Sequence, residues 1–365
     1  MLATERAARL EPLRRRLAEL ELDAILVSAP ANIRYLSGFT GSLGYLLIGG
    51  QTAEIVGDSR YWVQMEEEAV GFDLVRSGLS ADVLSAVTDR LRSAGFTRLG
   101  FEAQDLTVAG FETLRSRVGQ GVSLQPLRGV VEELRMHKRP EEIERLRAVA
   151  GISSRAFDRI RGSIRPGLRE RDLAFLLEQA FRELGADGPA FETIVASGER
   201  GALPHARPTD RVIERGDMIV FDFGARAAGY CADVSRTVVV GQPSPQQQRA
   251  IDAVQRAQAA GIAAMRKGAT ADAIDRIARQ VVEQAVGREH AFGHGLGHGI
   301  GLEVHERPTL SSRDQTALAP GMVITNEPGV YVPGWGGVRI EDMVLVMESG
   351  PEVITSASRE VAIAA

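Results

Sequence analysis

Four acidic residues lie inside apolar stretches and are the residues of this sequence best suited to chemistry. Asp222 interrupts IVFDFG and Asp233 lies in CADVSRTVVV, whereas Glu327 and Glu341 lie in TNEPGVYVPGWGGVRIED. Acidic side chains are rarely buried unless they are paired or bound to a metal. Carboxylates inside strands that should be buried therefore indicate a shared role, such as cation binding.

The first two carboxylates fall on a predicted hairpin. A hairpin that turns at Ala227 and Ala228 places Asp222 directly opposite Asp233. Directly opposed residues hold their Cβ atoms about 4.5–5.5 Å apart, and like charges there destabilise a sheet. We therefore expect a positive charge between these two side chains; the alternative is that one carboxyl group is protonated or that both reach solvent.

The other two carboxylates repeat this pattern. A turn centred on Gly334, within VPGWGG, places Glu327 opposite Glu341. Two hairpins that each present a pair of like charges are difficult to explain by chance. The repetition favours one site in which all four carboxylates surround bound cations.

The stretch GHGLGHGIGLEVHE supplies a nitrogen ligand. Glycine occupies every second position from Gly293 to Gly301, with His294 and His298 between. Alternate residues of a strand share a face, so one face is bare backbone and the other carries the histidines. A phosphate-binding loop would need a following helix or a nearby lysine, and LEVHERP provides neither. We therefore predict a strand whose His298 reaches the cations.

Four carboxylates and one imidazole form an oxygen-rich ligand set. Such a set suits Mn²⁺ or Mg²⁺, and the nitrogen ligand favours Mn²⁺, with Co²⁺ and Zn²⁺ as alternatives. Four negative charges balance two divalent ions. Paired ions about 3.5–4 Å apart can clamp the transition state of a hydrolysis. The ligand set therefore predicts a hydrolase with two metal ions.

Between about residues 200 and 342 five stretches form a recognisable series: LPHARP, VFDFGARAAGYCADVSRT, FGHGLGHGIGLEVHE, TNEPGVY and GGVRIED. In this order they resemble the creatinase, prolidase and methionine aminopeptidase superfamily, and most closely its Xaa-Pro peptidase branch. RYLSGFTGSLGYLLI and DSRYWVQ resemble the N-terminal domain of Xaa-Pro aminopeptidases and prolidases. The resemblance implies a pita-bread catalytic domain that binds two metal ions.

The resemblance also implies a role for each candidate ligand. One metal ion would be held by Asp222, Asp233 and Glu341. The other would be held by Asp233, His298, Glu327 and Glu341. Asp233 and Glu341 would therefore bridge the two ions.

Further residues match positions around the reacting bond. Glu327 would also act as general base toward the attacking water. His205 and His305 match the histidines that contact substrate and stabilise the tetrahedral intermediate. Three further side chains would bind substrate, those of His294, Tyr331 and Arg339. Two threonines would orient the ligand carboxylates, Thr237 and Thr325.

The resemblance makes an Xaa-Pro aminopeptidase the leading prediction, with a peptide carrying proline in second position as substrate. The alternative is an Xaa-Pro dipeptidase (prolidase) restricted to dipeptides. A metal-free binding protein or a creatinase-type hydrolase ranks below both, because such relatives lack several ligands and all five are present here.

These residues must be positioned by two domains. Strand and helix signals alternate in residues 1–131, which predicts a smaller α/β creatinase-like N-terminal domain. Residues 132–365 form the predicted catalytic domain, of the α+β class with an antiparallel sheet. Its helices are expected near 140–161, 168–184, 244–267 and 271–286, the first with Pro140 at its first position.

The composition of the chain argues against nucleic-acid-binding and membrane-spanning proteins. The 365 residues carry a formal net charge of -5, which argues against a nucleic-acid partner. No apolar run approaches the roughly 18 residues of a membrane span, and no signal peptide is evident. The one cysteine, Cys231, fits a reducing compartment, so we expect a cytoplasmic protein. The resemblance implies a homodimer or a higher homo-oligomer.

Overall fold

The computed structural model describes residues 3–78 and 83–363. The chain folds as two compact units, Met1–Arg135 and Met136–Ala365. The boundary expected between residues 131 and 132 falls inside helix α6 (Val130–Met136), whereas the units divide near the end of that helix. No helix within the described ranges is both long and apolar enough to span a bilayer.

The first unit contains a six-stranded mixed sheet in the order β4-β3-β2-β1-β5-β6. Its strands are β1 (Ala24–Val27), β2 (Tyr45–Gly49), β3 (Ala53–Gly57), β4 (Asp73–Arg76), β5 (Arg98–Glu102) and β6 (Ser123–Leu127). Its other helices are α1 (Ala3–Glu19), α2 (Pro30–Ser37), α3 (Trp62–Glu68), α4 (Val83–Ser93) and α5 (Val108–Val118). Helix α2 was not predicted, although Pro30 at its start and Gly38 at its end (φ 87°) are recognisable signals.

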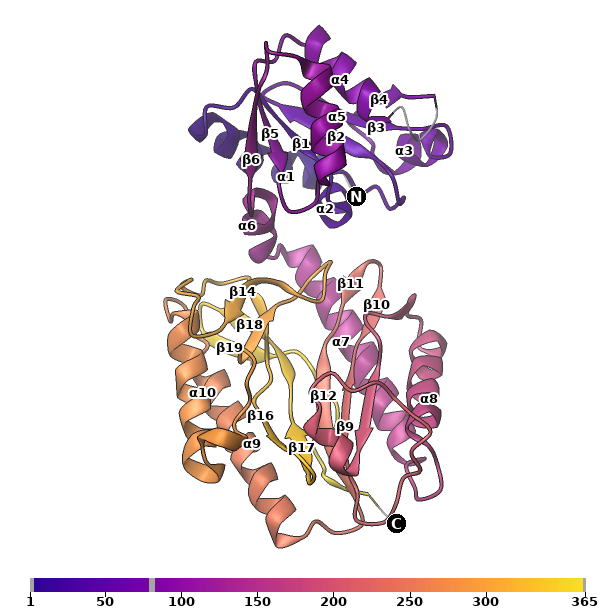
Figure 1. Ribbon diagram of the computed structural model, residues 1–365, viewed down its shortest axis with the longest axis vertical. Coiled ribbons are helices and arrows are strands. Elements are labelled where there is room, and N and C mark those ends of the chain that lie inside the picture. The colour runs from indigo at the N-terminus through magenta and orange to yellow at the C-terminus, as the bar shows by residue number, and fades with distance from the viewer. Residues whose placement is uncertain (1–2, 79–82, 364–365) are drawn as a thin grey trace. The chain divides into compact units, whose positions relative to one another are not determined.

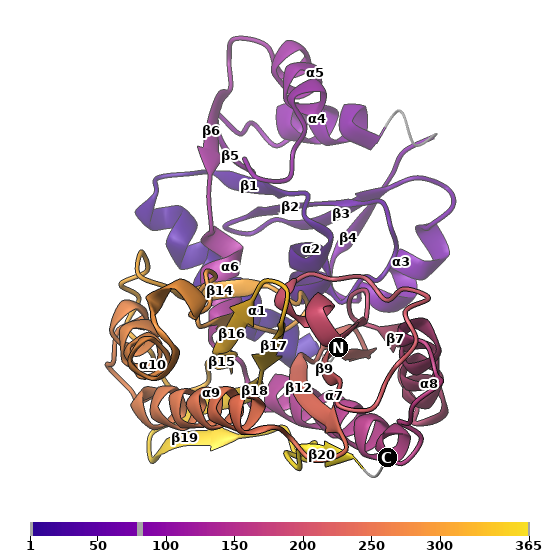
Figure 2. The ribbon, with the colours of Figure 1, turned by 60° about the horizontal axis from the view of Figure 1, so that its bottom comes forward.

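In the described part of the second unit, four α-helices flank two main sheets. The helices are α7 (Pro140–Arg161), α8 (Glu170–Glu183), α9 (Pro245–Ala264) and α10 (Ala271–Val286). The α7–α8 pair packs beside one sheet and the α9–α10 pair beside the other (Figures 1 and 2). Two apolar clusters form the core of this unit, one around α7 and α8 and the other around α9 and α10, and each includes residues of both sheets. The four helices lie close to their predicted ranges, and α7 begins at Pro140 as expected.

The strands of this unit pair almost entirely antiparallel. One sheet has the order β20-β12-β9-β8, and the other β14-β13-β15-β18-β19. The strands of the first are β8 (Ile194–Ser197), β9 (Met218–Phe223), β12 (Val234–Val240) and β20 (Ala362–Ile363). Those of the second are β13 (Gly297–Gly299), β14 (Glu306–Leu310), β15 (Val323–Asn326), β18 (Asp342–Met347) and β19 (Gly350–Val353). Smaller pairings involve β7 (Gly188–Pro189), β10 (Ala225–Ala227), β11 (Tyr230–Cys231), β16 (Gly329–Val332) and β17 (Gly336–Arg339). Among the described residues of this second unit, only the pair of β12 with β20 is parallel, so the predicted antiparallel α+β class is confirmed.

The first hairpin turns one residue later than predicted. Its turn lies at Ala228 and Gly229, with φ values of 49° and 83°, and Asp222 pairs with Ser235 rather than with Asp233. A tight two-residue turn of this kind needs positive φ at both central positions, and glycine adopts it without strain. The predicted pairing of Asp222 with Asp233 was therefore wrong. The two residues keep the same parity, however, and remain diagonal neighbours on one face.

The second hairpin has the predicted register but is interrupted at its carboxylates. Strand β15 pairs with β18, and β16 with β17, around a turn centred on Gly334. Glu327 and Glu341 lie between these pairs, outside the strands. The N–H of Glu327 donates to Leu296 O at 2.8 Å, and that of Glu341 to Ser235 O at 3.0 Å. Both carboxylate-bearing residues are thus held by a neighbouring segment of the site.

The glycine-rich stretch forms the short strand β13, within the longer strand predicted for residues 293–301. A Cβ atom on Gly297 would lie 2.0 Å from Thr325 O, and one on Gly299 would lie 2.1 Å from Arg307 O. The bare face therefore permits close approach of the flanking backbones. His298 alternates with these glycines, as predicted.

Candidate metal centre

Asp233, His298 and Glu341 form a buried group. Each offers one ligand atom, and these atoms all lie within 4.8 Å of one another. His298 Nε2 lies 3.6 Å from Asp233 Oδ2 and 3.6 Å from Glu327 Oε1. The breaks after β11, β15 and β17 place the three acidic residues of this neighbourhood at strand ends. The fold thus brings together four of the five predicted ligands.

Asp222, the fifth, borders this group from β9. Its Oδ2 accepts a hydrogen bond from Arg339 Nη2 at 2.6 Å, while its charge raises the pKa of Asp233 and of Glu341. Arg339 is buried, and its Nε also donates to Ser235 Oγ at 2.8 Å. Asp222 is therefore fixed beside the other carboxylates by a buried arginine.

Three oxygen atoms of the group are buried and have no hydrogen-bond partner among the described residues. They are Oδ1 of Asp222, Oδ1 of Asp233 and Oε1 of Glu341. Buried polar atoms without a partner are rare and costly. Anionic oxygens in that state are suited to divalent cations, which replace the missing donors. The donor set therefore fits the two ions that the sequence predicts.

Burial and mutual repulsion raise the pKa of Asp233, Glu327 and Glu341 in the absence of metal. Burial is the main cause that raises the pKa of Asp233 and of Glu327 well above the usual range, with Glu341 as the next cause. Burial, followed by the charge of Asp222, raises the pKa of Glu341 to about 8. Metal binding must therefore displace protons from this site.

The imidazole of His298 is neutral at physiological pH. Burial and then His305 lower its pKa to about 4. Its Nδ1 lies 3.1 Å from Gly299 O, so a proton on Nδ1 is hydrogen-bonded there. In that tautomer Nε2 carries no proton, and its lone pair faces Asp233 and Glu327. A neutral imidazole with a free Nε2 lone pair is the form that binds metal.

These pKa shifts predict how the metal-free protein responds to pH. Between the ordinary pKa of 4.5 and about 8, folded Glu341 holds more proton than the unfolded chain. The stability of the metal-free protein should therefore fall as pH rises through that window. Thermal unfolding of EDTA-treated protein measures this slope, and Glu341→Gln should remove part of it. An equal slope in both proteins would contradict the assignment.

Two of the predicted substrate contacts are exposed histidines beside the group. The rings of His298 and His305 lie 4.3 Å apart between centroids. Partial burial of the His305 ring is the main cause that lowers its pKa, and His205, in the loop after η2 (Gly198–Ala202), lies near enough to lower it further. Both imidazoles therefore lie at the accessible side of the centre, where a substrate could reach them.

The other predicted substrate contacts form a chain of hydrogen bonds. His294 Nε2 lies 3.0 Å from Tyr331 Oη, and Arg339 Nη1 donates to the same oxygen at 3.0 Å. Burial lowers the pKa of His294 to about 4 and raises that of Tyr331. The chain continues from Arg339 to Asp222, so the structure links these three residues to a predicted ligand.

Two threonines near the group have other partners than predicted, and one serine that was not predicted binds a candidate ligand. Thr237 Oγ1 exchanges hydrogen bonds with the backbone of Arg339, and Thr325 Oγ1 accepts one from His298 N, so neither threonine holds a carboxylate as expected. Glu341 Oε2 is instead bonded by Ser235 Oγ at 2.8 Å. The signal for Ser235 was its position two residues after Asp233, on the same strand face.

The chain matches the sequence model of metallopeptidase family M24 over residues 144–348 and that of the creatinase/prolidase N-terminal domain over residues 9–137. It is 36% identical to an Xaa-Pro dipeptidase of Pyrococcus furiosus, over 96% of this chain and 99% of that protein. The structure resembles an Xaa-Pro dipeptidase from Bacillus anthracis with a TM-score of 0.94 and 39% identity, over 98% and 99% of the two chains. It also resembles an X-Pro aminopeptidase from Thermotoga maritima with a TM-score of 0.89 and 37% identity, over 97% and 99%.

Proposed function

Because the chain belongs to metallopeptidase family M24, we propose that it is an exopeptidase that hydrolyses Xaa-Pro dipeptides. The buried group of Asp233, His298 and Glu341 carries this proposal. The sequence favoured an Xaa-Pro aminopeptidase and kept the dipeptidase as its alternative. The dipeptidase names among similar proteins support that alternative better, although an aminopeptidase is also among them.

The proposed ligands are the five predicted residues, with Asp233 and Glu341 shared between two ions. The oxygen-rich set with a single nitrogen supports Mn²⁺ over Co²⁺ or Zn²⁺. Bound ions would polarise the scissile carbonyl and lower the pKa of an attacking water molecule. The unpartnered oxygens of Asp222, Asp233 and Glu341 support this placement.

The side chains around the ions would transfer a proton, stabilise the developing negative charge and hold the substrate. We assign Glu327 the role of general base, which takes a proton from the attacking water and returns it to the departing proline nitrogen. His205 and His305 would stabilise the negative charge that develops on the carbonyl oxygen. His294, Tyr331 and Arg339 would hold the substrate, a role supported by their linked hydrogen bonds.

Substrate length decides between the two peptidase activities. For the Mn²⁺-loaded enzyme we expect kcat/KM for Ala-Pro to exceed that for Ala-Pro-Ala by about 10-fold or more, since a difference of about 1.4 kcal/mol in transition-state binding is enough. Ala-Ala serves as the control for proline specificity. Faster hydrolysis of Ala-Pro-Ala would establish the aminopeptidase instead. Metal analysis that finds no bound ion after Mn²⁺ loading would favour the metal-free alternatives.

Oligomerisation and cellular location stay predictions. We propose a homodimer or a higher homo-oligomer in the cytoplasm, supported by the family resemblance and by a single free cysteine, Cys231. Sedimentation of the purified chain measures the oligomeric state. A monomer at all concentrations would contradict that part of the proposal.

A further inference from the structure

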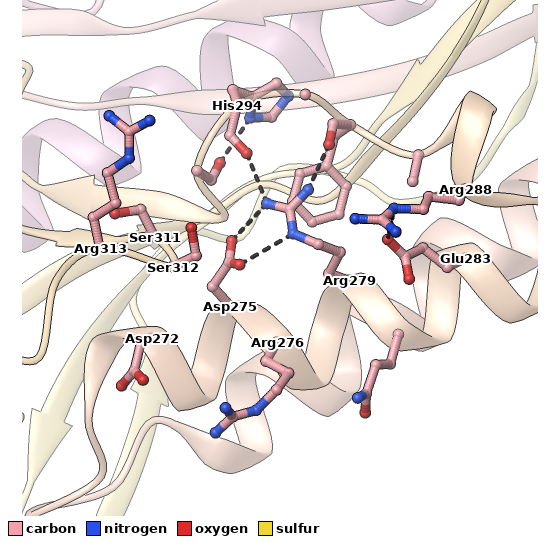
Figure 3. A pocket seen from close by; sticks show the side chains of 15 residues that line it. Asp272, Asp275, Arg276, Arg279, Glu283, Arg288, His294, Ser311, Ser312 and Arg313 are labelled. Carbon is pink, nitrogen blue, oxygen red and sulfur yellow. Dashed lines mark hydrogen bonds and ion pairs between the residues drawn. The ribbon is translucent and has the colours of Figure 1, made fainter.

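An ion pair on helix α10 has no part in the chemistry described so far. Asp275 and Arg279 lie one helical turn apart. Arg279 Nη2 lies 2.8 Å from Asp275 Oδ1, and Nε lies 3.1 Å from Asp275 Oδ2, so the pair is bidentate. The Asp275 side chain is 2% exposed and that of Arg279 26%. The pair forms part of the wall of an open cavity of about 860 Å³, in which Figure 3 shows both side chains pointing toward His294.

The same two side chains bind the backbone of the segment that leads into β13. Arg279 Nη1 donates to Phe292 O at 2.6 Å, and Nη2 donates to His294 O at 2.8 Å. Asp275 Oδ1 accepts from Leu296 N at 3.1 Å, an N–H that also donates to Leu310 O at 2.6 Å. This segment precedes β13 and is bent at Gly293, His294 and Leu296. The ion pair therefore holds the bent backbone in place through three hydrogen bonds.

The aromatic neighbours strengthen the contact. The Arg279 guanidinium lies 4.2 Å from the centroid of the Phe292 ring, and that ring lies 5.3 Å from the ring of His294. Arginine offers a planar group that can stack and donate several hydrogen bonds at once, which lysine cannot do. Arg279 is thus bound on its face by an aromatic ring and on its edge by two carbonyls and a carboxylate.

The position of this backbone determines where the imidazole of His294 lies. Its Nδ1 lies 2.7 Å from Gly295 O and its Nε2 lies 3.0 Å from Tyr331 Oη, so both nitrogens have fixed partners. A shift of the backbone at His294 would break the contact with Tyr331. A displacement of about 1 Å at a reacting centre can cost about 10²-fold in rate.

We propose that the Asp275–Arg279 pair positions His294 for the hydrolysis of Xaa-Pro substrates without touching the substrate. The inference rests on the proposed function, in which His294 contacts substrate. It assigns the two α10 side chains to the support of that contact, and it makes the cavity beside α10 the route by which solvent reaches Arg279.

The test compares Arg279→Ala, Arg279→Lys and Asp275→Asn with Arg276→Ala, whose exposed arginine lines the same cavity. We expect kcat/KM for Ala-Pro to fall about 10–100-fold in the first three variants and to stay unchanged in the control. Added guanidinium ion, at concentrations that leave the fold intact, should restore activity to Arg279→Ala through the open cavity. It should not restore Arg279→Lys, whose side chain fills the space. Folded Arg279→Ala with wild-type kcat/KM, or without rescue, would overturn the proposal.

A second measurement does not depend on activity. In metal-free protein with labelled histidines, the ring signal of His294 is assigned by its loss in His294→Gln. That signal should shift or broaden in Arg279→Ala and Arg279→Lys and stay in place in Arg276→Ala. An unmoved His294 signal in the folded Arg279 variants would overturn the proposal even if Xaa-Pro hydrolysis is observed. If no Xaa-Pro substrate is cleaved, a shifted signal still supports the positioning, and only the proposed function fails.

Discussion

Asp233→Asn should lower kcat/KM for Ala-Pro by about 10³-fold or more and, in the metal-free protein, raise stability at the same time. The loss follows because Asp233 is the proposed ligand shared by both ions, on which the stabilisation of the transition state depends. The gain in stability follows from the surroundings of Asp233. Burial is the main cause that raises the pKa of Asp233, and the charges of Glu341, Asp222 and Glu327 raise it further. An amide of the same shape removes that repulsion, by about 1–3 kcal/mol near pH 8.

The two effects are measured on one preparation. Steady-state kinetics with added Mn²⁺ gives the loss, and urea unfolding of EDTA-treated protein gives the gain. Asp252→Asn is the matched control, because Asp252 is an acidic residue of α9 that accepts an exposed hydrogen bond from Gln248. Activity within a few-fold of wild type in Asp233→Asn would contradict the metal assignment. Lower stability of that variant without metal would contradict the repulsion argument.

Arg236→Met should destabilise the second unit by about 3–5 kcal/mol, because it leaves Asp342 buried without its main counter-charge. Arg236 Nη2 lies 2.7 Å from Asp342 Oδ1, and the two side chains are 3% and 0% exposed. Arg236 Nη1 also donates to Glu341 O at 2.6 Å and to Ser235 O at 2.8 Å. Loss of these bonds should therefore loosen the backbone next to Glu341 and lower the affinity for Mn²⁺ as well.

A second arginine provides the control for this prediction. Arg359 Nη2 lies 2.6 Å from Asp342 Oδ2, but its side chain is 48% exposed. Arg359→Met should therefore cost less than about 1 kcal/mol, since solvent screens an exposed pair. In a Trp62→Phe background, fluorescence from Trp335 reports the unfolding of the second unit alone. Equal losses in the two arginine variants would contradict the argument from burial.

Much of the fold follows from local signals in the sequence. Helix α7 begins at Pro140 and α10 covers the range that apolar periodicity predicts, because both are long elements with a buried face. The register predicted for the first hairpin was wrong, because its turn lies one residue later than expected. The position of the turn depended on whether Ala228 adopts a positive φ, which cannot be predicted from the residue type. The structure shows positive φ at both Ala228 and Gly229, so the turn lies there.

The candidate site was predicted unevenly. Asp222, Asp233, Glu327 and Glu341 were recognisable because charges inside apolar strands need partners. Parity was enough to place them on common faces, even where the exact pairing was wrong. The supporting residues were harder to predict. Arg236 with Asp342, and Arg279 with Asp275, act through contacts between elements or with a distant backbone, and such contacts leave no periodic signal in the sequence.

The glycines of β13 have a consequence for natural variation. An added methyl group at Gly297 or Gly299 would lie about 2 Å from a carbonyl oxygen of an adjacent strand, so packing alone excludes all other amino acids there. His298, in contrast, has its proposed role through its imidazole, whose Nε2 lies 3.6 Å from Asp233 and from Glu327. A homologue that retains both glycines but has lost His298 should accordingly be assigned the same architecture and a different activity. Within one short motif, the glycines therefore indicate the fold of a homologue, and the histidine indicates its activity.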